Sequence, residues 1–374
     1  MISIWEKETF FAHQDIIIVG SGFVGLWSAF FLKKKHPNLK ITILERGTIP
    51  TGASTRNAGF ACFGSLSELV SDVKTMGLDK TLSLVEMRYK GLERIQKHFD
   101  ADAIDFEMCG GYELFDQSIT SEKLDEDILY LNSLLKDITD TKKTFKKVDE
   151  RISSYGFAST SHLVKNNLEG YLHSGKLVQG LLQRVQSMGV QVLNGITVTS
   201  IGQKDDGVEL ITDQPYHFTA SQLLICTNAF NELLPDVDII PARGQVLLTS
   251  PIPNLPWQGT FHADEGYYYF RNLGNRVLLG GARNKAFEAE TTTEMQPSDY
   301  IQQALEDYLE NTILPHFKHQ YTIEHRWAGI MGMGSDKSPI VKKLAPHIFC
   351  AVRMSGIGVA LAPVVGSQVE SMMR

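Results

Sequence analysis

The sequence has no apolar run close to the roughly 20 residues that a bilayer span requires, and residues 1–14 lack the apolar stretch of a signal peptide. Cysteine is scarce: the four in 374 residues lie far apart, with no CxxC pair and no zinc-like spacing. Positive charge is not in excess, and the net charge of -7 argues against nucleic-acid binding. These absences favour a cytoplasmic protein with no membrane span and no nucleic-acid partner.

The histidines do not predict a metal site either. His316 and His319 have an i,i+3 spacing that a metal site can use, but no acidic residue accompanies them in the same run. A surface pair is therefore the preferred interpretation. The chain length and its 43% hydrophobic content are sufficient for two or three domain-sized lobes.

A strand, a glycine loop and a helix follow one another near the N-terminus. Residues 15–19 are a β-branched run typical of a buried parallel strand, and residues 26–35 have the apolar spacing of a helix. Between them, Gly20 permits a tight turn, Gly22 lets the backbone approach a pyrophosphate, and Gly25 brings helix and strand together. The start of the helix then points free N–H groups at the phosphates. This order predicts a dinucleotide site; an ordinary glycine turn is the alternative.

An acidic residue stands where a ribose-binding carboxylate is expected. The second predicted strand, residues 40–44, ends in Glu45, which lies 20 residues after Gly25. A carboxylate there accepts hydrogen bonds from ribose hydroxyls and repels a 2′-phosphate, so NADP is disfavoured. The fingerprint does not by itself separate FAD from NAD.

Small and hydroxyl residues fill the segment after Glu45, which suits a backbone passing close beside a cofactor and equally suits a polar surface loop. The motif Gly52-Ala53-Ser54-Thr55-Arg56-Asn57-Ala58-Gly59 resembles a loop of the D-amino-acid-oxidase-like flavoproteins, which include glycine oxidase, sarcosine oxidase and gamma-glutamylputrescine oxidase. In that family the loop lies along the FAD, so the resemblance implies an FAD-dependent oxidoreductase.

The resemblance continues in order along most of the chain. It covers the segments 176–198, 223–229, 241–245, 326–329 and 336–340, with Cys226 and Asn228 departing from the family's usual turn. The cofactor-binding residues predicted from the motifs and the resemblance together are Gly20, Gly22, Gly25, Glu45, Arg46, Ala53, Ser54, Arg56, Asn57, Ala58, Val198, Thr227, Asn228, Gly329, Gly356, Ile357, Gly358 and Val359.

A glycine-containing segment, residues 354–363, follows the apolar run 348–352 and precedes a predicted C-terminal helix. Reduced flavin carries negative charge near N1 and C2=O, and a helix N-terminus aimed there stabilises that charge. In the family this loop contacts the pyrimidine edge of the ring. A turn that only starts a helix is the alternative.

Aromatic residues in the segment 265–271 are compatible with a substrate wall and with a sheet face packed on the core. This segment predicts a strand with residues 276–281 as its hairpin partner, which places Tyr267, Tyr269 and Arg271 on one face. Such a face binds the apolar body and carboxylate of an amino acid, or it packs on core with Arg271 reaching solvent. The two interpretations have equal weight.

The chain differs from glycine oxidase at the positions that bind the substrate carboxylate in that enzyme. Our matching puts Met331 and Gly356 where that enzyme has two carboxylate-binding arginines, and Arg353 is the nearby cation that can compensate. The sequence therefore leaves two classes of substrate as alternatives, simple amines and amino acids. Residues 330–335 contain no cysteine where sarcosine oxidases tether the flavin, so we expect non-covalent FAD.

The expected fold is an α/β Rossmann-type FAD-binding lobe with an interrupting α+β substrate lobe built on an antiparallel sheet. The FAD lobe is predicted from residues 1–85, 170–235 and 322–374, and the substrate lobe from 86–169 and 236–321. The predicted reaction is oxidation of a C–N bond in an amine or amino acid, with hydride transfer to flavin N5 and hydrolysis of the imine. The alternatives are a flavin dehydrogenase of a hydroxy acid that passes electrons to a quinone or protein, and a non-catalytic FAD-binding protein.

Overall fold

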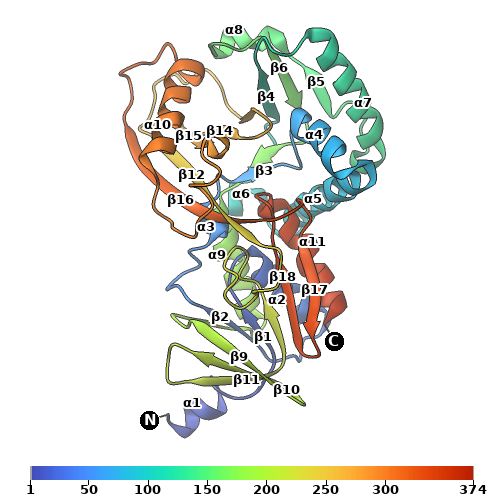
Figure 1. Cartoon of the computed structure of the whole chain (residues 1–374), viewed down its shortest axis with the longest axis vertical. Coiled ribbons are helices and arrows are strands. Elements are labelled where there is room, and N and C mark those ends of the chain that lie inside the picture. The colour runs from blue at the N-terminus through green and yellow to red at the C-terminus, as the bar shows by residue number, and fades with distance from the viewer. Residues whose placement is uncertain (1, 374) are drawn as a thin grey trace.

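A computed structural model describes residues 2–373, and two large sheets organise it. In Figure 1 the first sheet occupies the lower half and the second the upper half. The first has the path β17 (Ile340–Ala345), β18 (Ile348–Val352), β11 (His217–Ile225), β1 (Gln14–Val19), β2 (Ile41–Glu45) and β8 (Gln191–Asn194). Off this path, β10 (Gly207–Thr212) pairs with β11 and with β9 (Val198–Lys204).

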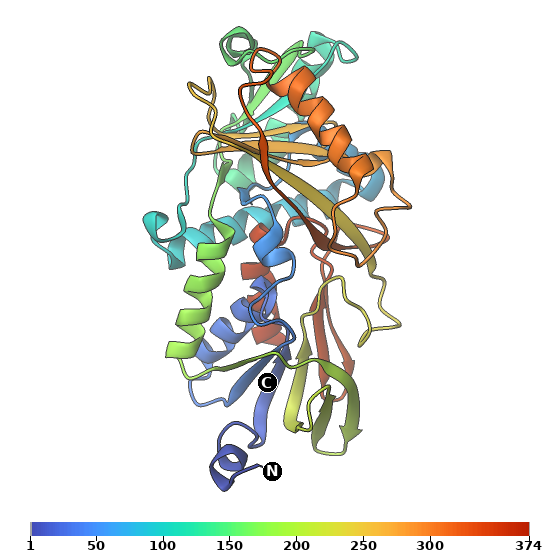
Figure 2. The same ribbon diagram turned by 90° about the vertical axis from the view of Figure 1, so that its left-hand side faces the viewer.

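The centre of the first sheet is parallel, as the N-terminal motif predicts. β1 pairs in parallel with β2 and with β11, and β8 and β18 extend the parallel run on either side. Apolar residues of β1 and β2 are buried on both faces because helices and the β9–β10 hairpin cover the sheet. Figure 2 shows helices on one side and the hairpin on the other.

Helices pack closely against this sheet and against one another. They are α2 (Phe23–Lys35), α5 (Leu78–His98), α9 (Ser174–Ser187) and α11 (Gly358–Met372). The crossing of α5 and α11 depends on Gly91, because a Cβ at this position would lie 1.6 Å from the carbonyl oxygen of Ala360. The two helices approach closely only because that side chain is missing.

Gly91→Ala should therefore lower the free energy of unfolding by about 1–3 kcal/mol or more, the cost of forcing extra volume into a packed core. Gly202→Ala is the matched control, since its Cβ would meet its nearest neighbours at ordinary distances of 3.7–3.9 Å. Urea unfolding of both variants tests this expectation. Equal midpoints for the two variants would show that the helix crossing adapts to the added carbon.

The second sheet carries the other lobe. Its strand order is β16 (Ile323–Met333), β12 (Ile240–Thr249), β15 (Arg276–Gly281), β14 (Tyr268–Leu273), β13 (Thr260–Ala263), β4 (Gly111–Phe115), β6 (His162–Asn166) and β5 (Phe145–Lys147). The pairs are antiparallel except for β13 with β4, so the expected antiparallel sheet contains one parallel pair. An aromatic core beneath it includes the stacked rings of Phe261 and Phe270, 4.7 Å apart.

Further helices and a small sheet complete the fold. They are α1 (Ile4–Glu8), α3 (Ala53–Arg56), α4 (Leu66–Met76), α6 (Ala101–Ile104), α7 (Ser121–Thr139), α8 (Ile152–Tyr155), α10 (Asp299–Tyr308), and the two-stranded sheet of β3 (Phe60–Ala61) and β7 (Gly170–Tyr171).

The observed fold confirms the predicted class, an α/β lobe joined to an α+β lobe. The predicted boundary at residue 322 assigns β16 to the FAD lobe, whereas this strand pairs with β12 in the second sheet. The remaining lobe boundaries stay predictions.

Candidate FAD and substrate site

A cavity of about 790 Å³ lies between the two sheets, within the range of sites that bind cofactors and small molecules. One side is formed by the carboxyl ends of β1, β2 and β11, the loop around α3 and the start of α11. The other side comes from β12, β14, β15, β16 and His262 of β13. The predicted cofactor residues all line it except Gly25.

The glycine loop has the geometry that its sequence predicts. Gly20 has φ +103°, and a Cβ there would approach the carbonyl oxygen of Cys226 to 2.8 Å. A Cβ on Gly25 would lie 2.0 Å from the carbonyl oxygen of Gly20, so Gly25 brings the helix close to the loop without contacting the cavity. The N–H of Val24, in the first turn of α2, makes no hydrogen bond to another described residue. It is available to a phosphate oxygen.

Glu45 is held rigidly at the end of β2. Its Oε2 accepts hydrogen bonds from the backbone N–H of Ser21 at 3.0 Å and from the Ser21 hydroxyl at 2.7 Å. Its Oε1 accepts from the N–H of Gly47 at 2.9 Å. The carboxylate is mostly buried but lines the cavity, and it ties the glycine loop to the end of β2.

Glu45→Ala should weaken FAD binding by about 1.5–3 kcal/mol, the range for hydrogen bonds to a charged group. Asp15→Ala is the control, since Asp15 likewise accepts a backbone hydrogen bond, from Lys40, but lies away from the cavity. Titration of apoprotein with FAD measures both dissociation constants. An unchanged value for Glu45→Ala would show that this carboxylate does not reach the ribose.

The Arg56 and Asn57 side chains form hydrogen bonds to protein groups. Arg56 donates to the carbonyl oxygens of Thr51 and Ala328, both at 2.9 Å, and accepts a hydrogen bond at its own carbonyl from Trp327 Nε1. Asn57 donates to carbonyl oxygens within α3 and accepts from the N–H of Gly59. These contacts position the loop against β16, so that its backbone borders the cavity.

The start of α11 is open toward the cavity. Its N-cap residue Ile357 provides no side-chain cap, and the N–H groups of Gly358 and Val359 have no hydrogen-bond partner among residues 2–373. Gly356 has φ +83°, a conformation that favours glycine, and its added Cβ would meet Met331 Sδ at 3.5 Å. Free donors and the positive end of a 15-residue helix thus face the cavity.

Tyrosines form the wall that we expect beside a substrate. The ring of Tyr269 lies across Gly280, where a Cβ would come within 2.5–2.7 Å of its atoms. Burial raises the pKa of the Tyr269 phenol to about 12. Tyr267 also lines the cavity, although it lies in the turn before β14 and not in the strand that the sequence predicts from residue 265.

Arg283 is a cation of the cavity wall that sequence reasoning missed. It begins a 3-10 turn directly after β15 and lines the cavity. Within residues 2–373 its side chain makes no hydrogen bond or ion pair, and its guanidinium lies 4.8 Å from the centre of the Phe287 ring. The nearby Glu290 is already neutralised by Arg243 at 2.7 Å. Burial lowers the pKa of Arg283, which stays cationic and free to bind an anion.

Two predicted substrate residues, Arg271 and Arg353, do not line the cavity. Arg353 is nearly buried and ion-paired with Asp238 at 2.5 Å and Asp336 at 2.8 Å. Arg271 shares a face with Tyr269, as predicted, but lies over the Tyr171 ring at 4.5 Å. We correct both assignments. Arg353 binds Asp336 in the loop before β17. Arg271 is buried over the Tyr171 ring, so it neither lines the cavity nor reaches solvent.

A dinucleotide fold joined to a second lobe across a cofactor-sized cavity defines a two-lobed flavin oxidoreductase. The chain belongs to the FAD dependent oxidoreductase family, which residues 15–372 match. FAD is accordingly the cofactor, and the residues fit it: an open glycine loop, a fixed carboxylate at β2, and uncapped helix N–H groups at the opposite end.

Similar proteins agree with this family. The probable oxidoreductase OrdL of Haemophilus influenzae is 25% identical over 95% of this chain and 81% of its own length. L-proline dehydrogenase from P. horikoshii superposes with a TM-score of 0.77 at 18% identity, covering 96% of this chain and 93% of that one. Glycine oxidase from Geobacillus kaustophilus superposes with a TM-score of 0.76 at 20% identity, covering 97% and 95%. At these identities the two structures support the fold.

None of the helices in residues 2–373 has the length and apolar composition required to cross a bilayer.

Proposed function

We propose that this oxidoreductase oxidises the C–N bond of an amino acid whose carboxylate is bound by Arg283. The observation that carries the proposal is an unpaired guanidinium on the cavity wall beside Tyr267 and Tyr269. Arginine presents several N–H donors in a planar fork that matches a carboxylate. A simple amine would leave this cation without a partner.

The other residues of this chain orient the substrate and shape its surroundings. The Tyr269 ring offers an apolar surface to the substrate. Met331 contributes a thioether to the cavity wall, and this group cannot donate a hydrogen bond to an anion. The free N–H groups at the start of α11 stabilise negative charge at the far edge of the cavity. FAD, when bound, would supply the acceptor for the hydride that leaves the carbon bearing the amine. The imine product then hydrolyses in water, and no protein base is assigned.

Solved proteins with this fold support an amino-acid substrate. They include proteins named glycine oxidase, iminodiacetate oxidase and L-amino acid deaminase. A cytoplasmic location is part of the same proposal, and the four free cysteines are compatible with it.

An anaerobic screen tests this function. Purified protein is mixed with amino acids, with the corresponding amines that lack the carboxylate, and with 2-hydroxy acids, while flavin absorbance is followed. We expect bleaching by a subset of amino acids and much weaker bleaching by their decarboxylated partners. Bleaching by 2-hydroxy acids alone would favour a hydroxy-acid dehydrogenase. A flavin that no compound reduces, although dithionite does, would contradict the proposal.

A further inference from the structure

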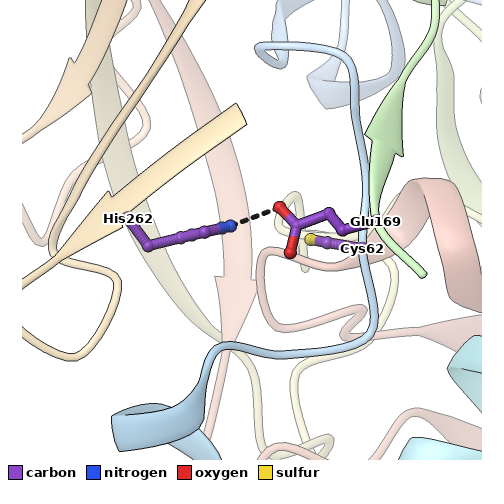
Figure 3. Close-up of side chains that lie close together, drawn as sticks. All are labelled: Cys62, Glu169 and His262. Atoms are coloured by element: carbon purple, nitrogen blue, oxygen red, sulfur yellow. Dashed lines mark hydrogen bonds and ion pairs between the residues drawn. The ribbon is translucent and has the colours of Figure 1, made fainter. Parts of the chain in front are cut away.

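Three side chains that the proposed reaction does not use lie together beside the cavity. They are Cys62, just after β3, Glu169, just before β7, and His262 on β13. Their ligand atoms all lie within 4.8 Å of one another, and the residues are 5%, 1% and 8% exposed. Figure 3 shows the Glu169 carboxylate between the imidazole of His262 and the thiol of Cys62.

The Glu169 carboxylate has one oxygen with partners and one without. Oε1 accepts hydrogen bonds from His262 Nε2 at 2.5 Å and from the Thr260 hydroxyl at 2.8 Å. Oε2 is buried and has no hydrogen-bond partner among the described residues. Leaving a charged oxygen buried and unpaired is costly, so such an atom points to a bound cation or donor.

The backbone around the carboxylate makes room for it. A Cβ at Gly111 would lie 2.2–2.7 Å from the carboxyl atoms of Glu169. The opposite side of the cluster is open, because Cys62 and His262 both line the large cavity. An ion can therefore reach the three side chains from the cavity and keep a fourth coordination position there.

We propose that Cys62, Glu169 and His262 bind one zinc ion. Thiolate, imidazole and carboxylate are the ligand types that zinc takes, and the sulfur selects it over magnesium or calcium. One thiolate and one carboxylate balance the charge of the divalent ion. Three protein ligands with an open fourth position is the arrangement of a catalytic-type zinc site.

The contact between His262 and Glu169 requires only a small adjustment. Zinc bonds of about 2.0–2.1 Å to nitrogen and oxygen place tetrahedral ligands roughly 3.3 Å apart, so the 2.5 Å contact between His262 and Glu169 opens by under about 1 Å. The Thr260 hydroxyl stays in place and orients the carboxylate, as partners of metal ligands commonly do. Sequence spacing conceals this site, since its ligands come from three distant segments.

Metal analysis of the FAD-loaded protein tests the proposal. After incubation with Zn²⁺ and gel filtration, we expect one zinc per chain. Cys62→Ser and Glu169→Gln should each lose at least about 100-fold in affinity in competition with a chromophoric chelator, and Thr260→Val about 10–100-fold. Cys350→Ser is the matched control, because Cys350 is a buried thiol on β18 that does not line the cavity; it should bind zinc as the parent does. FAD content and melting temperature check that each variant is folded.

X-ray absorption at the zinc edge gives a test that needs no variant. We expect one sulfur at about 2.3 Å and two or three nitrogen or oxygen ligands at about 2.0–2.1 Å. Parent protein that retains no zinc would overturn the proposal and leave the cluster as a buried imidazole–carboxylate pair. A ligand shell without sulfur, or equal affinity in parent and Cys62→Ser, would overturn it as well. None of these readouts depends on which substrate the enzyme oxidises.

Discussion

Arg283→Gln should lower the second-order rate of flavin reduction by an amino acid about 10–150-fold. This range corresponds to the roughly 1.5–3 kcal/mol of a hydrogen bond to a charged group. The guanidinium binds the carboxylate in the ground state and in the transition state alike, so the loss should appear mainly as a higher substrate dissociation constant. Anaerobic stopped-flow measurements over a range of substrate concentrations separate the two parameters.

Arg276→Gln provides the matched control for Arg283. Arg276 lies at the start of β15, the strand that precedes Arg283, and it does not line the cavity. Its side chain is partly exposed and pairs with Glu324 at 2.9 Å. Its variant should reduce flavin at the parental rate. A second control uses the amine without its carboxylate, which should react equally with parent and Arg283→Gln. If the amino acid reduced the flavin of Arg283→Gln at the parental rate, Arg283 would not be a substrate-binding residue.

Gly358→Val should lower the midpoint potential of bound FAD by about 30–65 mV. A β-carbon at this position would lie 3.3 Å from Met354 Cβ and displace the first turn of α11, whose free N–H groups face the cavity. Reduced flavin gains negative charge that these groups stabilise, so the reduced form loses more than the oxidised form. Loss of about 1.5–3 kcal/mol corresponds to this shift for a two-electron couple.

Gly175→Val separates a redox effect from a general cost of replacing a helical glycine. Gly175 lies in the first turn of α9, away from the cavity, and its Cβ would meet the His173 ring at 3.1 Å. This variant should lose stability without a shift in potential. If folded Gly358→Val had the same FAD midpoint potential as the parent, the start of α11 would have a structural role and no redox role.

The cofactor half of the site follows from local sequence. Gly20, Gly22 and Glu45 act through backbone conformation and a fixed spacing between a strand, a turn and a second strand. These relations involve neighbouring residues, so they are visible in the linear sequence. This locality explains why the predicted Rossmann-type lobe is confirmed. The choice of FAD over NAD, which is also confirmed, came instead from the resemblance of the loop 52–59 to the flavoprotein family.

The substrate half depends on contacts that the linear sequence does not contain. The pattern of alternating residues predicts that Tyr269 and Arg271 share a face, but not that Tyr171 covers Arg271. Arg353 forms an ion pair with Asp238, 115 residues earlier in the chain, and its side chain does not reach the cavity. The available signal for Arg283 was a cation just beyond a Gly-Gly pair at a strand end, where missing side chains leave space.

Product analysis after one anaerobic turnover tests the central claim most directly. The enzyme is mixed with the amino acid that bleaches its flavin, and the products are quantified against the flavin reduced. The account predicts one carbonyl product for each flavin, formed when the C–N bond is oxidised and the imine is hydrolysed; the amine or ammonia is released from an acyclic amino acid and stays in the ring-opened product of a cyclic one. Flavin reduction that leaves the C–N bond of the substrate intact would contradict it.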